Sequence, residues 1–345
     1  MPTSHSIFKD QTILITGGTG SFGKALAKKL LTENVCHKVI IFSRDEWKQW
    51  EMRRNDPIFD HPKIRYFLGD VRDPQRLARA FSGVDIIVHA AALKQVPAAE
   101  YNPTEFINTN INGAINVIDA AIACGVKKVI ALSTDKAVNP INLYGATKLC
   151  SDKLFVAGNV YVGAKGYPVF SVVRYGNVAG SRGSIIPFWQ KLIEQGIPAL
   201  PITDERMTRF WITLEDSVDF VCKCFTRMKK GGEIFVPKIP SVRITDLAEA
   251  MAPKLPKEIC GIRPGEKLHE LMISADDARH TIEYKDHFVI LPELARDEVI
   301  PEECPIYPVK GKAVDPEFTY ASNTNTQWLT IDEITKFLAS RNEVL

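Results

Sequence analysis

Thr12-Ile-Leu-Ile-Thr-Gly-Gly-Thr-Gly-Ser-Phe-Gly23 is the stretch that decides the fold of this chain. Its first five residues form an apolar run typical of a buried strand, and a helix is predicted over about 21–31. Gly17, Gly20 and Gly23 permit a tight turn, close approach of a pyrophosphate to the backbone, and close packing of helix on strand. Free N–H groups at the start of the helix can bind the phosphates. The stretch therefore predicts the first strand, turn and helix of a dinucleotide-binding fold.

Apolar runs and helical patterns alternate through the next 150 residues or so. Five further strands are predicted, over Lys38–Phe42, Ile64–Leu68, Asp85–His89, Lys128–Leu132 and Val169–Arg174. One long helix is predicted from Thr104 to Cys124. This alternation predicts an α/β fold, a Rossmann-type doubly wound parallel sheet covered by helices on both faces. From about Pro187 the alternation is less regular. We therefore expect a mainly cofactor-binding Rossmann domain over 10–186 and a smaller, mainly substrate-binding carboxyl-terminal region over 187–330, with some chain crossing between them.

Composition bounds the class of protein. The chain has 345 residues, 45% of them hydrophobic, and its 43 basic and 41 acidic residues give a net charge of +2. No long basic run is present, so neither a nucleic acid nor a membrane surface is indicated as a partner. No apolar run approaches the roughly 18 residues of a membrane span, and the first ten residues do not resemble a signal peptide. The seven scattered cysteines are typical of reduced thiols in the cytoplasm; we expect no metal site, and Cys222-x-Cys224 to be core packing.

The residues after the second strand bear on which dinucleotide is bound. Ser43-Arg-Asp-Glu46 stands about 20 residues past the last glycine, where an acid would bind the ribose 2′-hydroxyl of NAD. Here Arg44 comes before the acids, and a guanidinium is well shaped to bind a 2′-phosphate. We therefore expect NADP; the alternative is that Asp45 binds NAD and Arg44 is a surface residue. Asp70, after the third strand, is placed to touch the adenine.

A second motif carries the chemistry. Tyr144 and Lys148 are one helical turn apart and share a face. A lysine ammonium beside a phenol lowers a pKa that is normally about 10, which would make Tyr144 an acid/base near neutral pH. Thr134, Asp135 and Lys136 lie on the loop at the end of the preceding strand. Alone, Tyr-x-x-x-Lys is more often an ordinary helical pair; the glycine motif changes that interpretation.

Together these motifs resemble the extended short-chain dehydrogenase/reductase superfamily, over roughly residues 10 to 330. Within it, eight motifs in order resemble the configuration-inverting UDP-N-acetylglucosamine 4,6-dehydratases that open pseudaminic acid biosynthesis for surface or flagellin glycosylation. They are Gly17-Gly-Thr-Gly-Ser-Phe-Gly, Ser43-Arg-Asp-Glu, Ala91-Ala-Leu-Lys, Ser133-Thr-Asp-Lys-Ala, Asn142-Leu-Tyr-Gly-Ala-Thr-Lys, Arg174-Tyr-Gly-Asn, Met207-Thr-Arg-Phe-Trp and Arg263-Pro-Gly-Glu-Lys. The resemblance implies a tightly bound NADP that is regenerated in each cycle and a homo-oligomer, a dimer or a hexamer.

The resemblance also implies roles in the reaction. Tyr144 would take the sugar 4-hydroxyl proton, Lys148 would hold the ribose, and Thr134 or Ser133 would hydrogen-bond the 4-oxygen. Asp135 would be the acid for the departing 6-hydroxyl and Lys136 the base at C5. Retaining sugar 4,6-dehydratases carry Asp-Glu at these two positions, so Lys136 would account for inversion at C5. To act as a base it needs a lowered pKa, which we expect from burial and from nearby cations such as Lys148.

Further contacts are implied residue by residue. Those to NADP would come from Gly17, Thr19, Gly20, Ser21, Phe22, Gly23, Ser43, Arg44, Asp45, Glu46, Trp47, Lys48, Asp70, Val71, Ala90, Lys94, Leu132, Ser133, Tyr144, Lys148, Val178, Ala179, Gly180, Ser181 and Arg182. Those to UDP-N-acetylglucosamine would come from Lys94, Asn177, Ile185, Thr203 and Arg263. Arg209 and Arg263 also suit a diphosphate clamp. In the tail loop this chain has Thr326 where the family tends toward asparagine, and Asn323 and Asn325 are the nearby alternatives.

Other functions stay open at this point. A UDP-hexose 4-epimerase needs Tyr144 and Lys148 but no acid–base pair at positions 135 and 136. A capsule-sugar 4,6-dehydratase/5-epimerase shares every motif. A catalytically silent NADP-sensing protein keeps the glycine loop but typically loses the tyrosine or the lysine, and both are present here.

Overall fold

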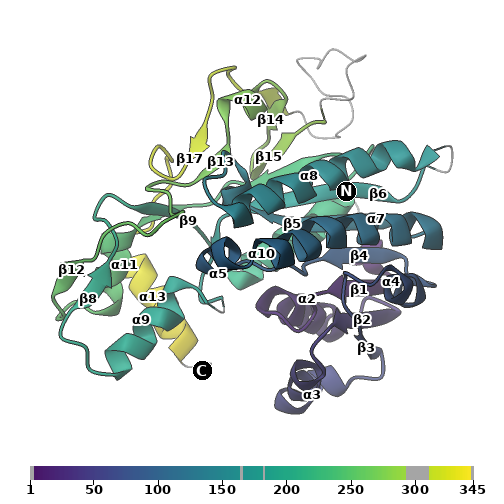
Figure 1. Cartoon of the computed structure of the whole chain (residues 1–345), viewed down its shortest axis with the longest axis horizontal. Helices are drawn as coiled ribbons and strands as arrows, with labels where there is room; N and C mark the ends of the chain where they lie inside the picture. The colour runs from purple at the N-terminus through teal and green to yellow at the C-terminus, as the bar shows by residue number, and fades with distance from the viewer. Residues whose placement is uncertain (1–3, 164–165, 182, 293–310, 343–345) are drawn as a thin grey trace.

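The computed structural model describes residues 4–163, 166–181, 183–292 and 311–342. Within these ranges ten strands form one sheet in the order β16-β14-β15-β10-β6-β5-β4-β1-β2-β3 (Figure 1). Seven of them run parallel, namely β3 (Ile64–Leu68), β2 (Lys38–Ser43), β1 (Thr12–Thr16), β4 (Ile86–His89), β5 (Lys128–Thr134), β6 (Val169–Tyr175) and β10 (Ile234–Pro237). The antiparallel edge consists of β15 (His287–Ile290), β14 (Thr281–Glu283) and β16 (Lys312–Ala313). The predicted α/β sheet is confirmed.

The order of the strands fixes where a ligand can bind. β1 lies between β2 and β4, and the chain runs outward from β1 to β3 before it returns to the other side of β1. At such a reversal the connections leave in opposite directions, which opens a crevice at the carboxyl ends of the strands. The glycine-rich turn follows β1 directly, so it lies in that crevice.

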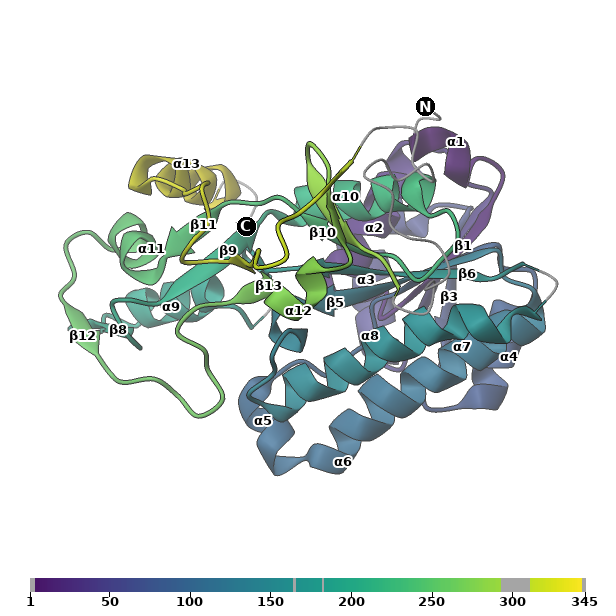
Figure 2. The same cartoon turned by 90° about the horizontal axis from the view of Figure 1, so that it is seen from above.

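Helices cover both faces of the sheet, as Figure 2 shows. One face carries α1 (Ser4–Phe8), α2 (Ser21–Thr32) and α10 (Leu214–Arg227), which pack on one another, with α3 (Glu46–Asn55) and η1 (Pro57–Asp60) at its end. The other face carries α4 (Pro74–Phe81), α5 (Val96–Tyr101), α6 (Pro103–Phe106), η2 (Ile107–Asn112), α7 (Gly113–Cys124) and α8 (Leu143–Tyr161). Because both faces are covered, the central strands are rich in apolar residues, and β1 is buried at every position.

The long helix predicted from Thr104 to Cys124 differs from the observed structure. The segment is helical, but its middle, Ile107–Asn112, has π-helical hydrogen bonding between α6 and α7. A π turn is wider than an α turn, and such turns recur at functional sites. Here the buried Asn110 side chain hydrogen-bonds to the backbone of Leu93 in the loop after β4. The helical pattern of the sequence predicts neither the π turn nor these hydrogen bonds.

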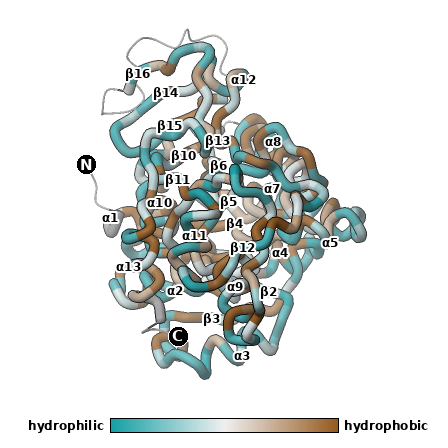
Figure 3. Tube along the Cα trace, turned by 90° about the vertical axis from the view of Figure 1, so that its left-hand side faces the viewer, coloured by the Kyte–Doolittle hydropathy of each residue, from teal (hydrophilic) through white to brown (hydrophobic). Residues whose placement is uncertain are grey.

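The carboxyl-terminal part builds a second, smaller core. Its elements are β7 (Asn177–Val178), β9 (Thr208–Ile212) and β11 (Ser241–Arg243) in one sheet, the pair β8 (Leu200–Ile202) and β12 (Lys257–Ile259), and α9 (Ile185–Glu194), α11 (Ile244–Met251) and α13 (Ile331–Asn342). Trp189, Trp211 and Leu247 are buried among them. In Figure 3 the hydrophobic stretches of the trace gather toward the middle of the molecule and the loops at its rim are mostly hydrophilic.

The chain crosses between the two regions. β10, β14, β15 and β16 follow residue 187 in the sequence yet lie in the large sheet. The pair β13 (Leu271–Ile273) and β17 (Tyr320–Ala321), together with α12 (Ala275–Ala278), lies beside the carboxyl end of β5, because β13 packs on η3 (Asp135–Ala137). Segments distant in sequence therefore meet next to Thr134, Asp135 and Lys136, the predicted catalytic loop.

The structure also bears on the predictions about the cysteines and about membrane spans. Cys222 and Cys224 are buried in α10, as predicted, and the six cysteines within the described ranges are free thiols. No helix in those ranges combines the length and the apolar character that crossing a membrane requires.

Candidate active site

The glycine-rich turn has the shape of a phosphate cradle. Gly17 has φ +66°, and a Cβ atom there would lie 2.9 Å from the backbone of Ala90. A Cβ at Gly23 would lie 2.5 Å from the Cα of Gly18, so that position holds α2 against the turn. Gly20 is the N-cap of α2 and provides no side-chain cap. The amino terminus of α2 directly follows this glycine turn, an arrangement that fits the pyrophosphate of a dinucleotide.

The end of β2 presents the residues that were expected to distinguish NADP from NAD. Arg44 has a side chain that is 52% exposed, and its Nη1 lies 3.9 Å from Oδ2 of Asp70. Asp45 caps α3: its carboxylate accepts a hydrogen bond from the N–H of Lys48 and forms an ion pair of 2.8 Å with the Lys48 ammonium. The Arg44 guanidinium is therefore more available to a ligand than the Asp45 carboxylate.

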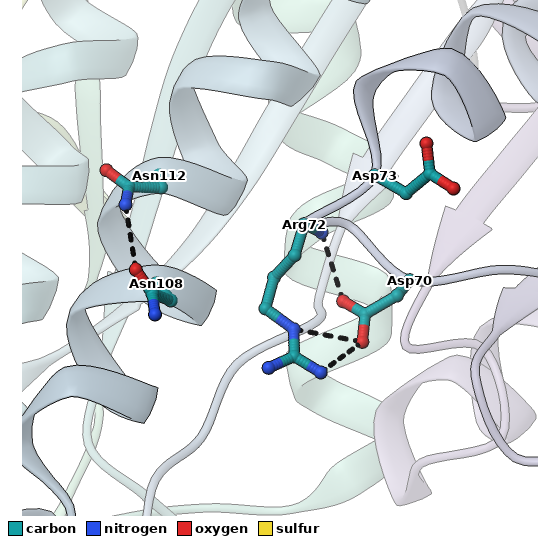
Figure 4. Close-up of a pocket in the computed structure, with 5 residues that line it drawn as sticks. All are labelled: Asp70, Arg72, Asp73, Asn108 and Asn112. Atoms are coloured by element: carbon teal, nitrogen blue, oxygen red, sulfur yellow. Dashed lines mark hydrogen bonds and ion pairs between the residues drawn. The ribbon is translucent and has the colours of Figure 1, made fainter.

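A cavity of about 430 Å³ lies at the carboxyl end of β3 (Figure 4). It is lined by Asp70, Arg72, Asp73, Asn108 and Asn112. The Asp70 carboxylate accepts two hydrogen bonds from the Arg72 guanidinium, at 3.0 and 2.8 Å. Burial opposes ionisation of Asp70, but the hydrogen bonds from Arg72 outweigh it and lower the pKa. The residue expected to touch the adenine thus lines a hollow at the same edge of the sheet as the glycine turn.

Asn110 fixes the loop that follows β4. Its side-chain amide donates to the carbonyl of Leu93 at 2.8 Å and to Oγ1 of Thr147 at 3.0 Å, and its Oδ1 accepts from the N–H of Leu93 at 2.9 Å. The loop that carries Ala90 and Lys94 is thereby fastened to α8. Burial and repulsion from Lys136 lower the pKa of Lys94, so this predicted binding residue lies within electrostatic range of the catalytic lysine candidate.

The structure brings the predicted catalytic residues together. β5 ends at Thr134, η3 carries Asp135 and Lys136, and α8 begins one residue before Tyr144. Thr134 donates to Oδ1 of Asp135 at 2.9 Å, and the Lys136 ammonium lies 3.0 Å from the same oxygen. Tyr144 lies near Thr134, whose side chain acts to lower the pKa of the phenol. Lys148 follows one turn along α8 and is buried.

The predicted ionisation of Tyr144 is corrected by the structure. We expected Lys148 to lower its pKa, but burial raises the pKa of Tyr144 to about 12. The cation that opposes this rise is Lys136 rather than Lys148. Lys148 is itself buried, and burial lowers the pKa of its ammonium while Asp152 raises it. Burial therefore keeps the phenol protonated at neutral pH.

The predicted pKa of Lys136 is likewise corrected. Burial lowers it, but attraction to Asp135 and Glu270 outweighs burial and raises the pKa above the usual value for lysine. The ammonium lies 3.0 Å from Asp135 and 3.3 Å from Glu270, and both carboxylates are buried. Sequence reasoning considered neighbouring cations and missed the second carboxylate. Lys136 is charged in this structure.

A second buried set of charges lies behind Ser133. The Ser133 hydroxyl donates to Oδ2 of Asp152 at 2.7 Å, and Arg174 lies 3.7 Å from the same oxygen. Arg174 also pairs with Asp277 at 3.2 Å. Asp152 comes four residues after Lys148, so the pattern Tyr144-x-x-x-Lys148-x-x-x-Asp152 could have revealed it on the same helical face. These residues join β5, α8 and α12 beneath the catalytic loop.

Among the predicted substrate residues, Asn177 and Ile185 lie where a ligand can reach backbone or side-chain groups. Oδ1 of Asn177, on β7, is buried and has no hydrogen-bond partner among the described residues. Ile185 is the first residue of α9, whose N-cap Ser184 makes no side-chain cap. Arg182, a predicted cofactor contact, lies outside the described residues.

Most of the other predicted substrate residues make contacts within the protein itself. Arg209 donates to the carbonyls of Thr208 and Leu268, at 2.7 and 3.1 Å, and its Nε lies 3.8 Å from Glu270. Arg263 lies 5.9 Å from the ring of Phe188 on α9. The Oγ1 of Thr203 contacts the sulfur of Met207. In the tail loop, Asn325 donates to Ile239 and Ser241, whereas Thr326 is exposed.

Comparisons with known proteins agree with this geometry. The family model described as polysaccharide biosynthesis protein matches residues 13–292. The UDP-N-acetylglucosamine 4,6-dehydratase (inverting) of Campylobacter jejuni subsp. jejuni serotype O:23/36 (strain 81-176) is 57% identical over 329 residues, covering 95% of this chain and 97% of that protein. The UDP-glucose 4-epimerase of Rickettsia massiliae (strain Mtu5) is 41% identical and covers 98% of both chains.

Solved structures agree on the fold. The X-ray structure of Pen from Bacillus thuringiensis superposes with a TM-score of 0.85 at 34% identity, covering 97% of this chain and 99% of that one. DesIV, a dTDP-glucose 4,6-dehydratase from Streptomyces venezuelae, superposes with a TM-score of 0.63 at 24% identity, over 74% of this chain and 86% of that one.

Gly145 determines how closely α8 approaches the catalytic loop, which gives a first prediction. A Cβ there would lie 2.2 Å from the carbonyl oxygen of Lys136. We expect Gly145→Ala to push the loop away from Tyr144 and to lower turnover about 100-fold, since misplacement by about 1 Å has that cost. Gly158→Ala in the same helix meets only side chains, at 3.3 Å, and is the matched control. Steady-state rates and thermal unfolding of both variants test this; equal rates would contradict it.

Proposed function

Because the chain belongs to the polysaccharide biosynthesis protein family, a family of extended short-chain dehydrogenases/reductases, we propose that it is an inverting UDP-N-acetylglucosamine 4,6-dehydratase. It would be a lyase that removes water across C5–C6 by way of a 4-keto intermediate, with hydride moved from C4 to C6. The product would be UDP-2-acetamido-2,6-dideoxy-β-L-arabino-hex-4-ulose. The observation that carries the proposal is the Asp135–Lys136 pair, 3.0 Å apart and beside Tyr144.

The site fits a nicotinamide dinucleotide, held by the glycine turn, the end of β2 and the residues Tyr144 and Lys148. Bound NADP would supply a hydride acceptor for C4, a hydride donor for C6, and positive charge near Tyr144. NADP is favoured over NAD because Arg44 is exposed at the end of β2, whereas Asp45 caps α3. A guanidinium matches the geometry of a phosphate.

The first steps fall to Thr134 and Tyr144. Thr134 lies near Tyr144, so a sugar 4-hydroxyl bound between them would contact both oxygens. Tyr144 accepts the 4-hydroxyl proton as hydride leaves C4. Since burial raises its pKa to about 12, the phenol needs positive charge nearby to act as a base. Lys136 provides part of it, and a bound cofactor would add to it.

Asp135 and Lys136 suit the elimination. One proton moving from the Lys136 ammonium to the Asp135 carboxylate, across 3.0 Å, yields both a neutral amine and a carboxylic acid. The amine then takes the C5 proton, made acidic by the 4-ketone, and the acid gives its proton to the departing 6-hydroxyl, which leaves as water. The pair returns to ammonium and carboxylate, so its proton count is unchanged. A proton from solvent, delivered to the opposite face of C5, inverts that centre, and Tyr144 releases the 4-hydroxyl proton to solvent, so the proton count closes over the cycle.

The nucleotide and sugar would be bound mainly from the carboxyl-terminal region. The unpartnered Oδ1 of Asn177 and the amino terminus of α9 at Ile185 suit substrate hydrogen bonds. Lys94, Thr203 and Arg263 are proposed on the resemblance of their motifs, with Thr326 or a neighbouring asparagine completing the site. Pseudaminic acid synthesis in the cytoplasm and assembly as a dimer or hexamer remain predictions.

A 4-epimerase is the second candidate, because relatives named UDP-glucose 4-epimerase match along almost the whole chain. Proton NMR of the protein with UDP-N-acetylglucosamine in heavy water separates the two. We expect a 4-keto-6-deoxy product with deuterium at C5 and the L-arabino configuration. Retained D-xylo configuration would remove the role given to Lys136. The appearance of UDP-N-acetylgalactosamine without dehydration would make the protein an epimerase.

Lys136 can be tested on its own. We expect Lys136→Ala to lower dehydration by about 100-fold or more, since a positioned general base contributes that much. Cofactor should remain bound, because the glycine turn and the end of β2 are distant from the substitution. The measurement is product formation beside the nicotinamide content of the purified variant. Undiminished activity would end the assignment of Lys136 as the base.

Arg44 provides the test of cofactor choice. We expect Arg44→Ala to weaken NADP binding about tenfold or more, the effect of losing a charge-assisted hydrogen bond, and to leave NAD binding nearly unchanged. Titration of cofactor-free protein with each dinucleotide measures both constants. Equal losses for the two cofactors would remove the 2′-phosphate role.

A further inference from the structure

We propose that Glu270 is a positioning residue for Lys136: its buried carboxylate holds the amine and stabilises the ammonium that forms when Lys136 takes the C5 proton. The inference rests on the proposed dehydratase function and extends it to a residue that none of the sequence motifs identified. Glu270 acts through Lys136 and makes no contact with substrate in this account.

The geometry of the pair supports this role. Oε1 of Glu270 lies 3.3 Å from Nζ of Lys136. The same Nζ lies 3.0 Å from Oδ1 of Asp135. Glu270 is 2% exposed. Its second oxygen, Oε2, is buried without a hydrogen-bond partner among the described residues. A buried carboxylate without full hydrogen bonding is costly, so its retention beside the reactive amine calls for a reason beyond packing.

The fold delivers Glu270 to this place through its backbone. Glu270 directly precedes β13, the strand that packs on η3. Its N–H donates to Oγ of Ser322 at 2.9 Å, and its carbonyl accepts from the N–H of Ser322 at 2.8 Å. Ser322 in turn shares a 2.7 Å hydrogen bond with Thr208. Both sides of the Glu270 backbone are therefore fixed, which fixes the start of its side chain.

The carboxylate has a defined effect during the reaction. When neutral Lys136 accepts the C5 proton it becomes an ammonium in a buried site, where an unpaired charge is strongly disfavoured. At that moment Asp135 is giving up its own proton to the 6-hydroxyl, so before the transfer is complete only Glu270 supplies a full negative charge. Glu270 is thus the carboxylate beside Lys136 that takes no part in the proton transfers, whereas Asp135 and Lys136 both change charge.

The balance of charge around Lys136 involves several elements. Attraction to Asp135 and Glu270 raises the pKa of the lysine, against burial and repulsion from Arg209 on β9. Lys136 in turn affects the ionisation of three further groups that face it, Lys94 after β4, Tyr144 on α8 and Lys267 before β13. Removal of the Glu270 charge would leave cations in excess, so the Lys136 ammonium would lose its proton at lower pH.

The test is the pH dependence of turnover for Glu270→Gln. The active form needs one proton shared by Asp135 and Lys136, so turnover falls on the alkaline side when that proton is lost. We expect this alkaline limb of kcat to move to lower pH by about one unit or more, the effect of removing an opposite charge at this distance. At the optimum kcat should fall at least about tenfold, with KM nearly unchanged.

A second readout follows the C5 chemistry alone. With substrate that carries deuterium at C5, the kinetic isotope effect on kcat should be larger for Glu270→Gln than for the wild-type protein, because Lys136 removes that atom and the variant slows this step. Glu270→Asp keeps the negative charge but places it one methylene farther from Lys136. The alkaline limb of kcat for this variant should therefore lie between those of the wild-type protein and the glutamine variant. If the glutamine variant does not fold, the aspartate variant carries both measurements.

Glu283→Gln is the matched control, since Glu283 forms an ion pair of 2.7 Å with Lys238 away from the site. It should keep the wild-type limb and kcat. An unmoved limb in both Glu270 variants, or a change in KM alone, would overturn the proposal. If the wild-type protein does not dehydrate UDP-N-acetylglucosamine, the proposed function fails; if it does and the Glu270 variants behave as wild type, only this inference fails.

Discussion

The ammonium of Lys136, bound between the carboxylates of Asp135 and Glu270, is the interaction on which the rest of the site depends. Taking charges out of water costs several kcal/mol per ion, and loss of one partner from a buried pair costs about 3–5 kcal/mol. Asp135 comes from the end of β5 and Glu270 from the start of β13. The carboxyl-terminal region therefore cannot move away from the sheet without leaving a buried charge unpaired. The charges assigned to the chemistry also hold the two regions in place.

Contacts with the backbone complete this arrangement. The Lys267 ammonium donates to the carbonyl of Val138, and the Asn142 side chain donates to the carbonyl of Gly265 at 2.7 Å. Arg174, at the end of β6, donates to the carbonyl of Met272 on β13. Each contact joins the segment 263–273 to a strand end or loop of the large sheet. The predicted substrate residue Arg263 thus belongs to a segment that is fastened to the catalytic loop, which favours cooperation between substrate binding and the acid–base pair.

Local patterns in the sequence were enough to predict six of the seven parallel strands, the glycine turn and the grouping of Tyr144, Lys148, Asp135 and Lys136, but not the seventh parallel strand, β10. These features depend on periodicity and on spacing within one strand, turn and helix. The ionisation of the site was not predictable in this way. Glu270 is far from Lys136 in sequence and carries no motif of its own, and burial of Tyr144 depends on packing from several elements. The π turn at Ile107–Asn112 was also missed, because its cause is a set of tertiary hydrogen bonds made by Asn110.

The raised pKa of Lys136 changes how its role as a base should be understood. A lysine between two carboxylates does not await substrate as a neutral amine, so deprotonation by solvent would be rare at neutral pH. Transfer of the proton to Asp135 avoids this problem, since it needs no exchange with water and generates the acid in the same step. A glutamate at position 136 would place a third carboxylate beside Asp135 and Glu270, and like charges this close cannot all ionise. A cation at this position thus pairs with both buried carboxylates, and it is also the residue that we propose as the base of the inverting chemistry.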